Sequence, residues 1–194
     1  MARPRQFDRD DALVQAMEVF WAKGFAATST DDLLQAMGIG RQSLYGSFGD
    51  KRRLYLEAMA RYQQESVAGH LQRLRAQASP LAGIEAMLLG LIDEDPAVRE
   101  KGCMGVGSVC EFGAADADLA ALRASAGGLQ HQALVERLEA AKAEGEVAAS
   151  LDVEAAARLI IITMQGLQVA GKAGASAADL RAAASLAVEG LRQQ

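Results

Sequence analysis

Apolar residues between positions 28 and 48 recur at the spacing of three or four residues that is typical of an α-helix. Leu33, Leu34 and Met37 form one such group and predict a short helix. Leu44 and Phe48 lie four residues apart and predict the buried face of a second short helix. The residues between and around this second pair are polar or small, so its outer face is expected to meet solvent or a partner.

The ends of these two helices are also marked in the sequence. Thr28, Ser29 and Thr30 offer hydroxyl groups that can cap the first helix at its N-terminus. Gly38 can adopt positive φ and is expected to end that helix, and Gly40 can start the next one. Together these features predict a helix-turn-helix.

Three cations follow, in the first turn of a third helix that Asp50 can cap. Lys51, Arg52 and Arg53 oppose the helix dipole, which favours anions at that end. A bound phosphate group held by backbone amides and these cations would account for the arrangement. A solvated charge cluster is the alternative, and the neighbouring helix-turn-helix pattern favours phosphate.

The remaining sequence predicts an all-α fold, with an N-terminal three-helix head followed by a helical body. Alanine is abundant, and the chain holds only 3 prolines, so long helices can run uninterrupted. Residues 101–113 read as a buried helix whose glycines permit close packing or leave room for a ligand; packing is favoured. Gly127 and Gly128 are expected to allow a kink. The predicted helices outside 28–48 span residues 8–23, 50–77, 116–144, 152–172 and 176–192, with two more that begin near Pro80 and Lys101.

Trp21 and Phe25 are most simply core residues that close the head together with Leu33 and Leu44. Residues 1–6 contain Arg3 and Arg5 and read as a basic arm; a frayed terminus or a DNA-contacting arm would both fit.

The last two predicted helices carry much apolar surface. Residues 160–164 make the first of them apolar nearly all round, so it needs cover on more than one side. The second has an apolar stripe that includes Leu180, Val188 and Leu191. This helix pair predicts a homodimer interface.

Charge is distributed unevenly along the 194 residues, whose net charge is −5. Residues 1–53 carry a net charge of +1 and the remaining residues a net charge of −6. DNA would repel the acidic body, and this repulsion would restrict DNA contact to the head. The sequence shows no signal peptide. Its longest strongly apolar run, residues 159–164, is far too short to span a membrane. We therefore expect a cytoplasmic protein without a membrane partner.

The body holds the candidate ligand-binding residues. Tyr62, Ser66 and His70 lie along one side of the helix predicted at 50–77, although a structural role is the alternative for His70. Cys103 and Cys110 lie on the predicted helix at 101–113, and Gln165 on that at 152–172.

The two cysteines allow two interpretations. Cys103 and Cys110 are seven residues apart on one predicted helix, so their Cα atoms would lie ~10 Å from each other. This distance is too great for a disulfide within the helix. Small buried packing residues are the simpler interpretation, and thiol sensing is the alternative.

Patterns of enzyme and metal chemistry are missing from the sequence. His70 and His131 stand in no metal-binding spacing, so no metal site is expected. The sequence contains no Cys-x-x-Cys, no phosphate-binding glycine loop and no nucleophile elbow. We expect no cofactor and no enzymatic activity.

The segment TSTDDLLQAMGIGRQSLYGSFGDKRRLY resembles the DNA-binding signature of the TetR/AcrR transcriptional regulators, well over residues 9–55 and more loosely beyond. Gly38, Leu44 and Lys51 are among the residues that carry the resemblance. Leu34, where the family commonly has alanine, and Gly46, where it often has a larger residue, depart from it.

The resemblance implies a ligand-responsive dimeric regulator, most often a repressor, that binds a palindromic double-stranded operator and an unknown small-molecule effector. It places Arg41, Gln42 and Ser43 near base edges, and Thr30, Tyr45, Ser47 and Lys51 near phosphates. It also implies a dimer formed by the last two helices as a four-helix bundle. Residues 1–49 would form the DNA-binding domain and residues 50–194 the effector-binding and dimerisation domain. A helical enzyme or a small-molecule binding protein without a DNA role is the rival hypothesis.

Overall fold

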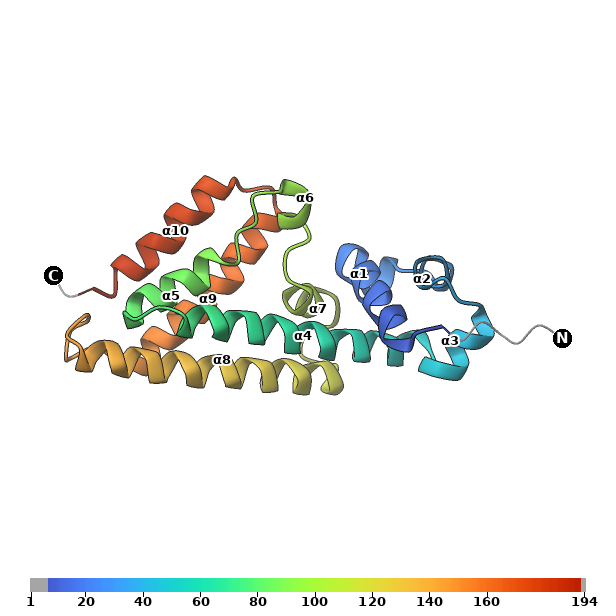
Figure 1. Cartoon of the computed structure of the whole chain (residues 1–194), viewed down its shortest axis with the longest axis horizontal. Helices are drawn as coiled ribbons and strands as arrows, with labels where there is room; N and C mark the ends of the chain where they lie inside the picture. Colours follow the sequence, from blue (N-terminus) through green and yellow to red (C-terminus); the bar gives the residue numbers. More distant parts are fainter. Residues whose placement is uncertain (1–6, 193–194) are drawn as a thin grey trace.

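The computed structural model describes residues 7–192, which fold into helices joined by short loops (Figure 1). The predicted all-α class is confirmed, and the basic arm at residues 1–6 lies outside the described residues. A small head of α1–α3 stands at one end, and the long helix α4 runs from it into the body (Figure 1). The helix α8 lies along α4 back toward the head, α7 lies near the head, and the other later helices pack at the far part of α4 (Figure 1). The helices are α1 (Arg9–Ala27), α2 (Thr30–Met37), α3 (Arg41–Phe48), α4 (Lys51–Arg75), α5 (Pro80–Leu89), α6 (Pro96–Arg99), α7 (Met104–Phe112), α8 (Ala117–Ala143), α9 (Val153–Lys172) and α10 (Ala177–Glu189).

Local chemistry explains where the head helices begin and end. Ser29 caps α2 in a reciprocal capping box with Asp32, and Gly38 ends that helix at φ 63°. Gly40 is the N-cap of α3, and the Asp50 carboxylate accepts a hydrogen bond from the Arg53 backbone N–H at the start of α4. These boundaries agree with the helix-turn-helix prediction.

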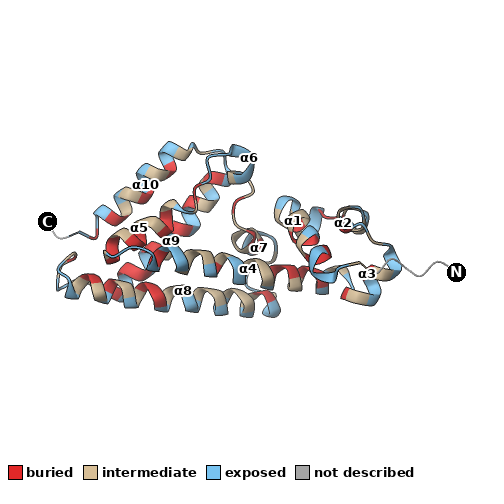
Figure 2. Cartoon of the chain, viewed as in Figure 1, coloured by how far each residue is buried: buried red, intermediate tan, exposed pale blue. Residues whose placement is uncertain are grey.

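The chain has two hydrophobic cores, whose buried residues are red in Figure 2. The head core includes the predicted Leu33, Met37, Leu44 and Phe48. It is completed by the first turns of α4 and by Met104 and Leu119 from α7 and α8, whereas the far end of α4 joins the body core through Leu74. The long helix is therefore part of both cores and joins them.

The C-terminal half of α1 has a feature that the helical pattern did not reveal. At Gly24 the backbone leaves helical geometry, with φ 80° and ψ 174°, and a last short turn follows to Ala27. Glycine suits this conformation because it lacks a Cβ atom. The predicted stop at Gly24 is thus a kink, and Thr28 Oγ1 donates to the Gly24 carbonyl oxygen to hold it.

Trp21 and Phe25 pack against the head core as expected, although both are only half-buried. They also contact Tyr62 and Phe112 at the junction between head and body. Two other packing expectations were wrong. The helix α7 is not a buried helix, since Met104 and Ser108 are its only fully buried positions. The helix α8 runs through Gly127 and Gly128 without interruption.

The expectation that no segment could span a membrane also needs correction. With 20 residues, and a mean hydropathy of 1.2 over an 18-residue window, α9 is long and apolar enough to do so by length and composition. Its buried side, which includes Ala157, Ile160 and Leu167, lies in the body core. Part of its apolar character is therefore used in the body core.

Candidate nucleic-acid interface and body cavity

The outer side of α3 is the candidate nucleic-acid interface. Leu44 and Phe48 are buried, so the helix turns Arg41, Gln42 and Tyr45 outward, where all three are exposed. Thr30, Ser43 and Ser47 are half-buried. The structure therefore leaves the predicted base-reading and phosphate-binding residues accessible to different degrees.

The structure gives Arg41 a partner that sequence reasoning missed. Its Nη2 atom donates to Asp31 Oδ1 at 2.7 Å, and both side chains are largely exposed. An exposed ion pair of this kind contributes little stability, so it mainly influences the direction of the guanidinium group. Asp31 therefore lies beside Arg41, next to the exposed side of α3.

The three cations at the start of α4 have separate environments, which revises their interpretation as one phosphate-binding cluster. Arg52 pairs with Asp118 at 2.7 Å and with Asp116 at 3.3 Å, so it ties α4 to α8. The Lys51 ammonium group lies 4.2 Å from the centre of the Phe25 ring, and Arg53 lies near Asp50. Lys51 is half-buried and Arg53 is exposed, whereas Arg52 is engaged in ion pairs with the start of α8.

Other polar residues fix the head. The guanidinium group of Arg9 donates to Ser47 O at 3.4 Å and to Glu57 at 2.5 Å, and it lies over the Phe48 ring. Asp32 accepts from Lys23 at 2.7 Å, and this bond, together with those from Ser29, holds the pKa of Asp32 below its usual range. These contacts connect α1 with both helices of the helix-turn-helix.

Polar contacts also join the head to α7 and the residues before it. The Trp21 indole N–H donates to Gly102 O at 2.8 Å, and Lys101 pairs with Glu18 at 3.0 Å. Beyond the kink at Gly24, the Glu111 carboxylate accepts from the Phe25 and Ala26 backbone N–H groups at 3.1 and 3.0 Å. One body segment thus holds α1 at two places. These residues are distant in sequence, and no local pattern indicated that they would meet.

A cavity of about 760 Å³ lies in the body between α4, α7, α8 and α9. All six predicted ligand-binding residues line it, so the structure brings together side chains from three helices: Tyr62, Ser66, His70, Cys103, Cys110 and Gln165. Sequence reasoning missed the apolar part of the lining, such as Val106, Ile161 and Met164. The cavity is within the size range of small-molecule sites.

The polar groups of this cavity are mostly uncharged. His70 Nδ1 and Gln130 Nε2 are 2.6 Å apart, and Gln63, Gln165 and Gln168 add further amides. Arg123 is the one charged side chain in the described lining, and its guanidinium group already donates to Ser108 Oγ and Gly113 O. The arrangement fits a largely apolar, uncharged molecule with a few hydrogen-bonding groups.

Burial keeps His70 neutral. Desolvation, with a further contribution from the nearby Arg73 charge, lowers the pKa of His70 to about 4. With Nδ1 accepting from Gln130, the Nε2 atom carries the proton and is left as a donor. Burial likewise raises the pKa of Tyr62, so its hydroxyl group remains a neutral donor and acceptor.

The low pKa of His70 predicts a pH dependence of stability. The unfolded chain, with a histidine pKa of about 6.5, binds a proton that the folded chain excludes down to about pH 4. Unfolding free energy should therefore decrease as the pH falls from 6.5 to 4, by up to ~1.4 kcal/mol per pH unit from this group. Urea unfolding of wild type and His70→Gln over this range should give a flatter profile for the variant; identical slopes would contradict the assignment.

The cysteines are not the buried packing residues that we expected. Cys103 is half-buried at the N-cap of α7, Cys110 is exposed, and both are free thiols that line the cavity. The three glycines of this segment differ. A Cβ atom at Gly105, which lines the cavity, would make an ordinary contact with Cys103 Sγ at 3.5 Å, and one at Gly107, outside the lining, would meet nothing within 4 Å. Gly102 is packed tightly against Lys172 and Gln168.

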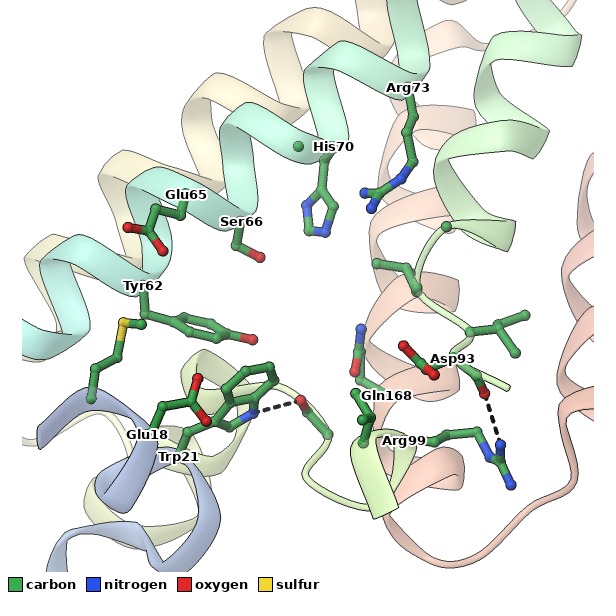
Figure 3. Close-up of a pocket in the computed structure, with 17 residues that line it drawn as sticks. Glu18, Trp21, Tyr62, Glu65, Ser66, His70, Arg73, Asp93, Arg99 and Gln168 are labelled. Atoms are coloured by element: carbon green, nitrogen blue, oxygen red, sulfur yellow. Dashed lines mark hydrogen bonds between the residues drawn. The ribbon is translucent and has the colours of Figure 1, made fainter. Parts of the chain in front are cut away.

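A second cavity of about 360 Å³ lies where α1 meets the body (Figure 3). Figure 3 shows Glu18 and Trp21 on α1 beside Tyr62 on α4, with Ser66 and His70 further along α4 above this space. Tyr62, Ser66 and His70 line both cavities. The two spaces therefore adjoin along α4, and the smaller one reaches the head.

Comparison with known proteins agrees with this geometry. Residues 12–58 match the family model described as bacterial regulatory proteins, tetR family. The chain is 31% identical to the HTH-type transcriptional repressor ComR of Escherichia coli over 180 residues, which cover 90% of this chain and 84% of that protein. This chain belongs to the TetR family. It is thus a DNA-binding transcriptional regulator and not an enzyme.

Other TetR-family proteins extend the likeness over the whole fold. The regulator YezE of Bacillus subtilis is 34% identical over 163 residues, which cover 82% of this chain and 84% of that protein. A cysteine-substituted form of the regulator CifR, solved with a 26 bp double-strand operator DNA, superposes with a TM-score of 0.83 at 30% identity. The superposition covers 98% of this chain and 100% of that one.

The family match spans the seven candidate DNA-binding residues of the TetR-family head, from Thr30 to Lys51. Among residues 7–192, no group of three or more His, Cys, Asp or Glu side chains could hold a metal ion.

Proposed function

We propose that the chain is a homodimeric repressor that binds a palindromic operator through its heads and releases it when a small molecule enters the body cavity. The observation that carries this proposal is the direct connection, through α4 and α7, between the exposed side of α3 and the 760 Å³ cavity. Residues 1–49 would serve as the DNA-binding domain and residues 50–194 as the effector-binding and dimerisation domain. ComR, a relative over most of the chain, is itself named a repressor.

In this proposal α3 enters the major groove. Arg41, Gln42 and Ser43 approach base edges, and arginine can donate two hydrogen bonds to the O6 and N7 atoms of guanine. Thr30, Tyr45, Ser47 and Lys51 contact phosphates, which position the head without reading sequence. The outward direction of Arg41, Gln42 and Tyr45 supports these roles.

The exposed side of α9 supports the homodimer. Six exposed, uncharged residues recur in steps of four and three along α9 and its C-cap: Ala155, Leu159, Ile162, Gly166, Val169 and Ala173. The exposed charged residues Glu154, Arg158 and Lys172 flank them. We call these six residues the α9 stripe. On α10, Leu186 is 73% exposed. Alternating small and apolar residues at this spacing form the seams of helical bundles. The 26 bp operator bound by CifR, about 88 Å long at 3.4 Å per base pair, has room for two heads.

The effector would be a largely apolar, uncharged molecule, bound by Tyr62, Ser66, His70, Cys103, Cys110 and Gln165. Binding would move α7, which lines the cavity and also holds the Phe25 and Ala26 amides through Glu111. A displacement of α7 would thus reach the head directly. Because the proposed function is to bind operator DNA, we also propose a cytoplasmic location without a membrane partner.

Substitution of Arg41 tests the reading of bases. The wild-type chain would first select a palindromic operator from random duplexes. Arg41→Ala is then expected to cost ~1–3 kcal/mol of binding free energy and to relax preference at one position in each half-site. The measurement is a binding series over single-base variants of that operator, at one fixed salt concentration.

Lys51→Ala is the matched control for this series, because it also removes one cation. It should weaken binding to every variant alike and reduce the slope of log affinity against log salt by ~1. If Arg41→Ala also weakens all variants uniformly, Arg41 is a phosphate contact, and Gln42 and Ser43 carry the specificity. If neither variant changes binding to any duplex, the proposed DNA-binding surface is wrong.

A thiol-sensing regulator is a second candidate, favoured by the accessible Cys103 and Cys110 in the cavity lining. If the effector binds reversibly and the thiols do not react, hydrogen peroxide should leave operator binding unchanged. This should hold both for the wild type and for the double variant Cys103→Ala, Cys110→Ala. Electrophoretic shift assays with and without peroxide measure this. Release from the wild type alone would instead establish the thiol sensor.

A further inference from the structure

One wall of the body cavity is open in a single copy of the chain. Val109 on α7, with 49% of its surface exposed, lines this wall together with Ile162 (63%) and Val169 (52%) on α9. Cys110 and Gly166, which are also exposed, lie in the same part of the lining. A small molecule bound there would keep one apolar side in water, whereas such sites usually bury about 70–90% of a ligand's surface.

The open wall is continuous with the proposed dimer face. Ile162, Gly166 and Val169 line the cavity and are also half of the α9 stripe. The stripe extends in both directions, to Ala155 near the start of α9 and to its C-cap Ala173; its own six residues carry no charge, and Glu154, Arg158 and Lys172 stand at its margins. A surface that packs against the stripe must therefore also approach the mouth of the cavity.

We propose that a second copy of this chain forms the missing wall, so that each effector site is shared between two protomers. This inference rests on the proposed homodimer and adds that the dimer completes the binding site. The partner's stripe is the matching surface, because two-fold symmetry brings equivalent uncharged faces together. Burying Val109, Ile162 and Val169 beneath it would remove their apolar surface from water.

Thermodynamic linkage follows from a shared site. A ligand that binds the dimer more tightly than the monomer must, by reciprocity, strengthen dimerisation. We expect about tenfold or greater tightening of ligand binding in the dimer, within the usual range of such coupling. Because a dimer holds two such sites, saturating ligand should lower the dimer dissociation constant by up to about the square of that factor.

The experiment uses N-phenyl-1-naphthylamine, an uncharged probe whose fluorescence rises in apolar cavities. Sedimentation velocity on the full-length wild type first gives the concentrations at which monomer and dimer dominate. Probe titrations at both concentrations should show affinity about tenfold or more weaker for the monomer. Equal affinities would overturn the shared site and leave the homodimer standing. A chain that stays monomeric at tens of micromolar, with and without probe, would overturn the homodimer, and the shared site with it.

Leu186→Glu provides the matched variant, since Leu186 lies on α10 outside the cavity lining. A carboxylate there would be buried in the proposed interface, so the variant should be monomeric and bind the probe as weakly as diluted wild type. Leu129→Glu is the control: Leu129 is 55% exposed on α8 and belongs to neither the α9 stripe nor the lining. It should dimerise and bind the probe like wild type. A folded, monomeric Leu186→Glu chain with wild-type dimer affinity for the probe would overturn the shared site. If Leu186→Glu remains dimeric or fails to fold, the wild-type dilution series decides.

Discussion

Gly24→Ala is expected to destabilise the head by about 1–3 kcal/mol, the usual cost of a non-glycine residue held in such a strained region. The backbone at Gly24 has φ 80° and ψ 174°, a conformation that alanine adopts only with strain. A Cβ atom would also overlap with the Glu111 carboxylate oxygen. The carboxylate would have to move away and leave the Phe25 and Ala26 N–H groups to water. The variant should therefore weaken both the head and its connection to α7.

Urea unfolding and operator binding together measure this effect. Gly128→Ala is the matched control, because Gly128 is exposed within α8 and a Cβ atom there meets nothing within 4 Å. That control should gain up to ~1 kcal/mol from the better helix propensity of alanine. Glu111→Gln separates the two causes, since it removes the charge and leaves the Gly24 backbone unstrained. Wild-type stability of Gly24→Ala would show that the kink is not required.

Gly83→Ala is expected to loosen the body. Gly83 is buried in α5, and a Cβ atom there would overlap with the backbone carbonyl oxygen of Leu74 on α4. A backbone atom cannot rotate away as the end of a side chain can, so the two helices must move apart. Overpacking of this kind costs about 1–3 kcal/mol, more than the ~1 kcal/mol that alanine gains in a helix.

Gly90→Ala is the comparison for this second variant. Gly90 follows α5 directly, and its added Cβ atom would meet the side chain of Arg73, which is exposed and can change rotamer. The loss in unfolding free energy should therefore be clearly smaller for Gly90→Ala than for Gly83→Ala. Equal losses in thermal or urea unfolding would mean that the contact between α4 and α5 tolerates a methyl group.

Features governed by near neighbours could be predicted from the sequence. Ser29, Gly38 and Asp50 act at helix ends as their chemistry requires, since a cap needs only the next three residues. Tyr62, Ser66 and His70 were placed on one side of a helix by spacing alone, and that side does face a cavity. Helical geometry fixes such relations whatever the rest of the chain does.

Features that depend on distant contacts could not be predicted. The ion pairs of Arg52 with Asp116 and Asp118 arise only because α8 runs back along α4. Cys110 was expected to be buried because residues 101–113 are mostly apolar or small. Composition does not say which side of a helix is buried, and Cys110 lies on the exposed side of α7. The kink at Gly24 depends in the same way on Glu111, a residue 87 positions further along the chain.

The polar junction between head and body bears on the engineering of chimeric regulators. A sensor made by grafting this head onto the body of another regulator would separate Trp21 from Gly102, Glu18 from Lys101, and the Phe25 and Ala26 amides from Glu111. A cut just before α4 would discard every one of these contacts and would also take the first turns of α4 out of the head core. Grafts that also carry residues 101–112 should transmit a signal better than grafts joined at residue 49 alone.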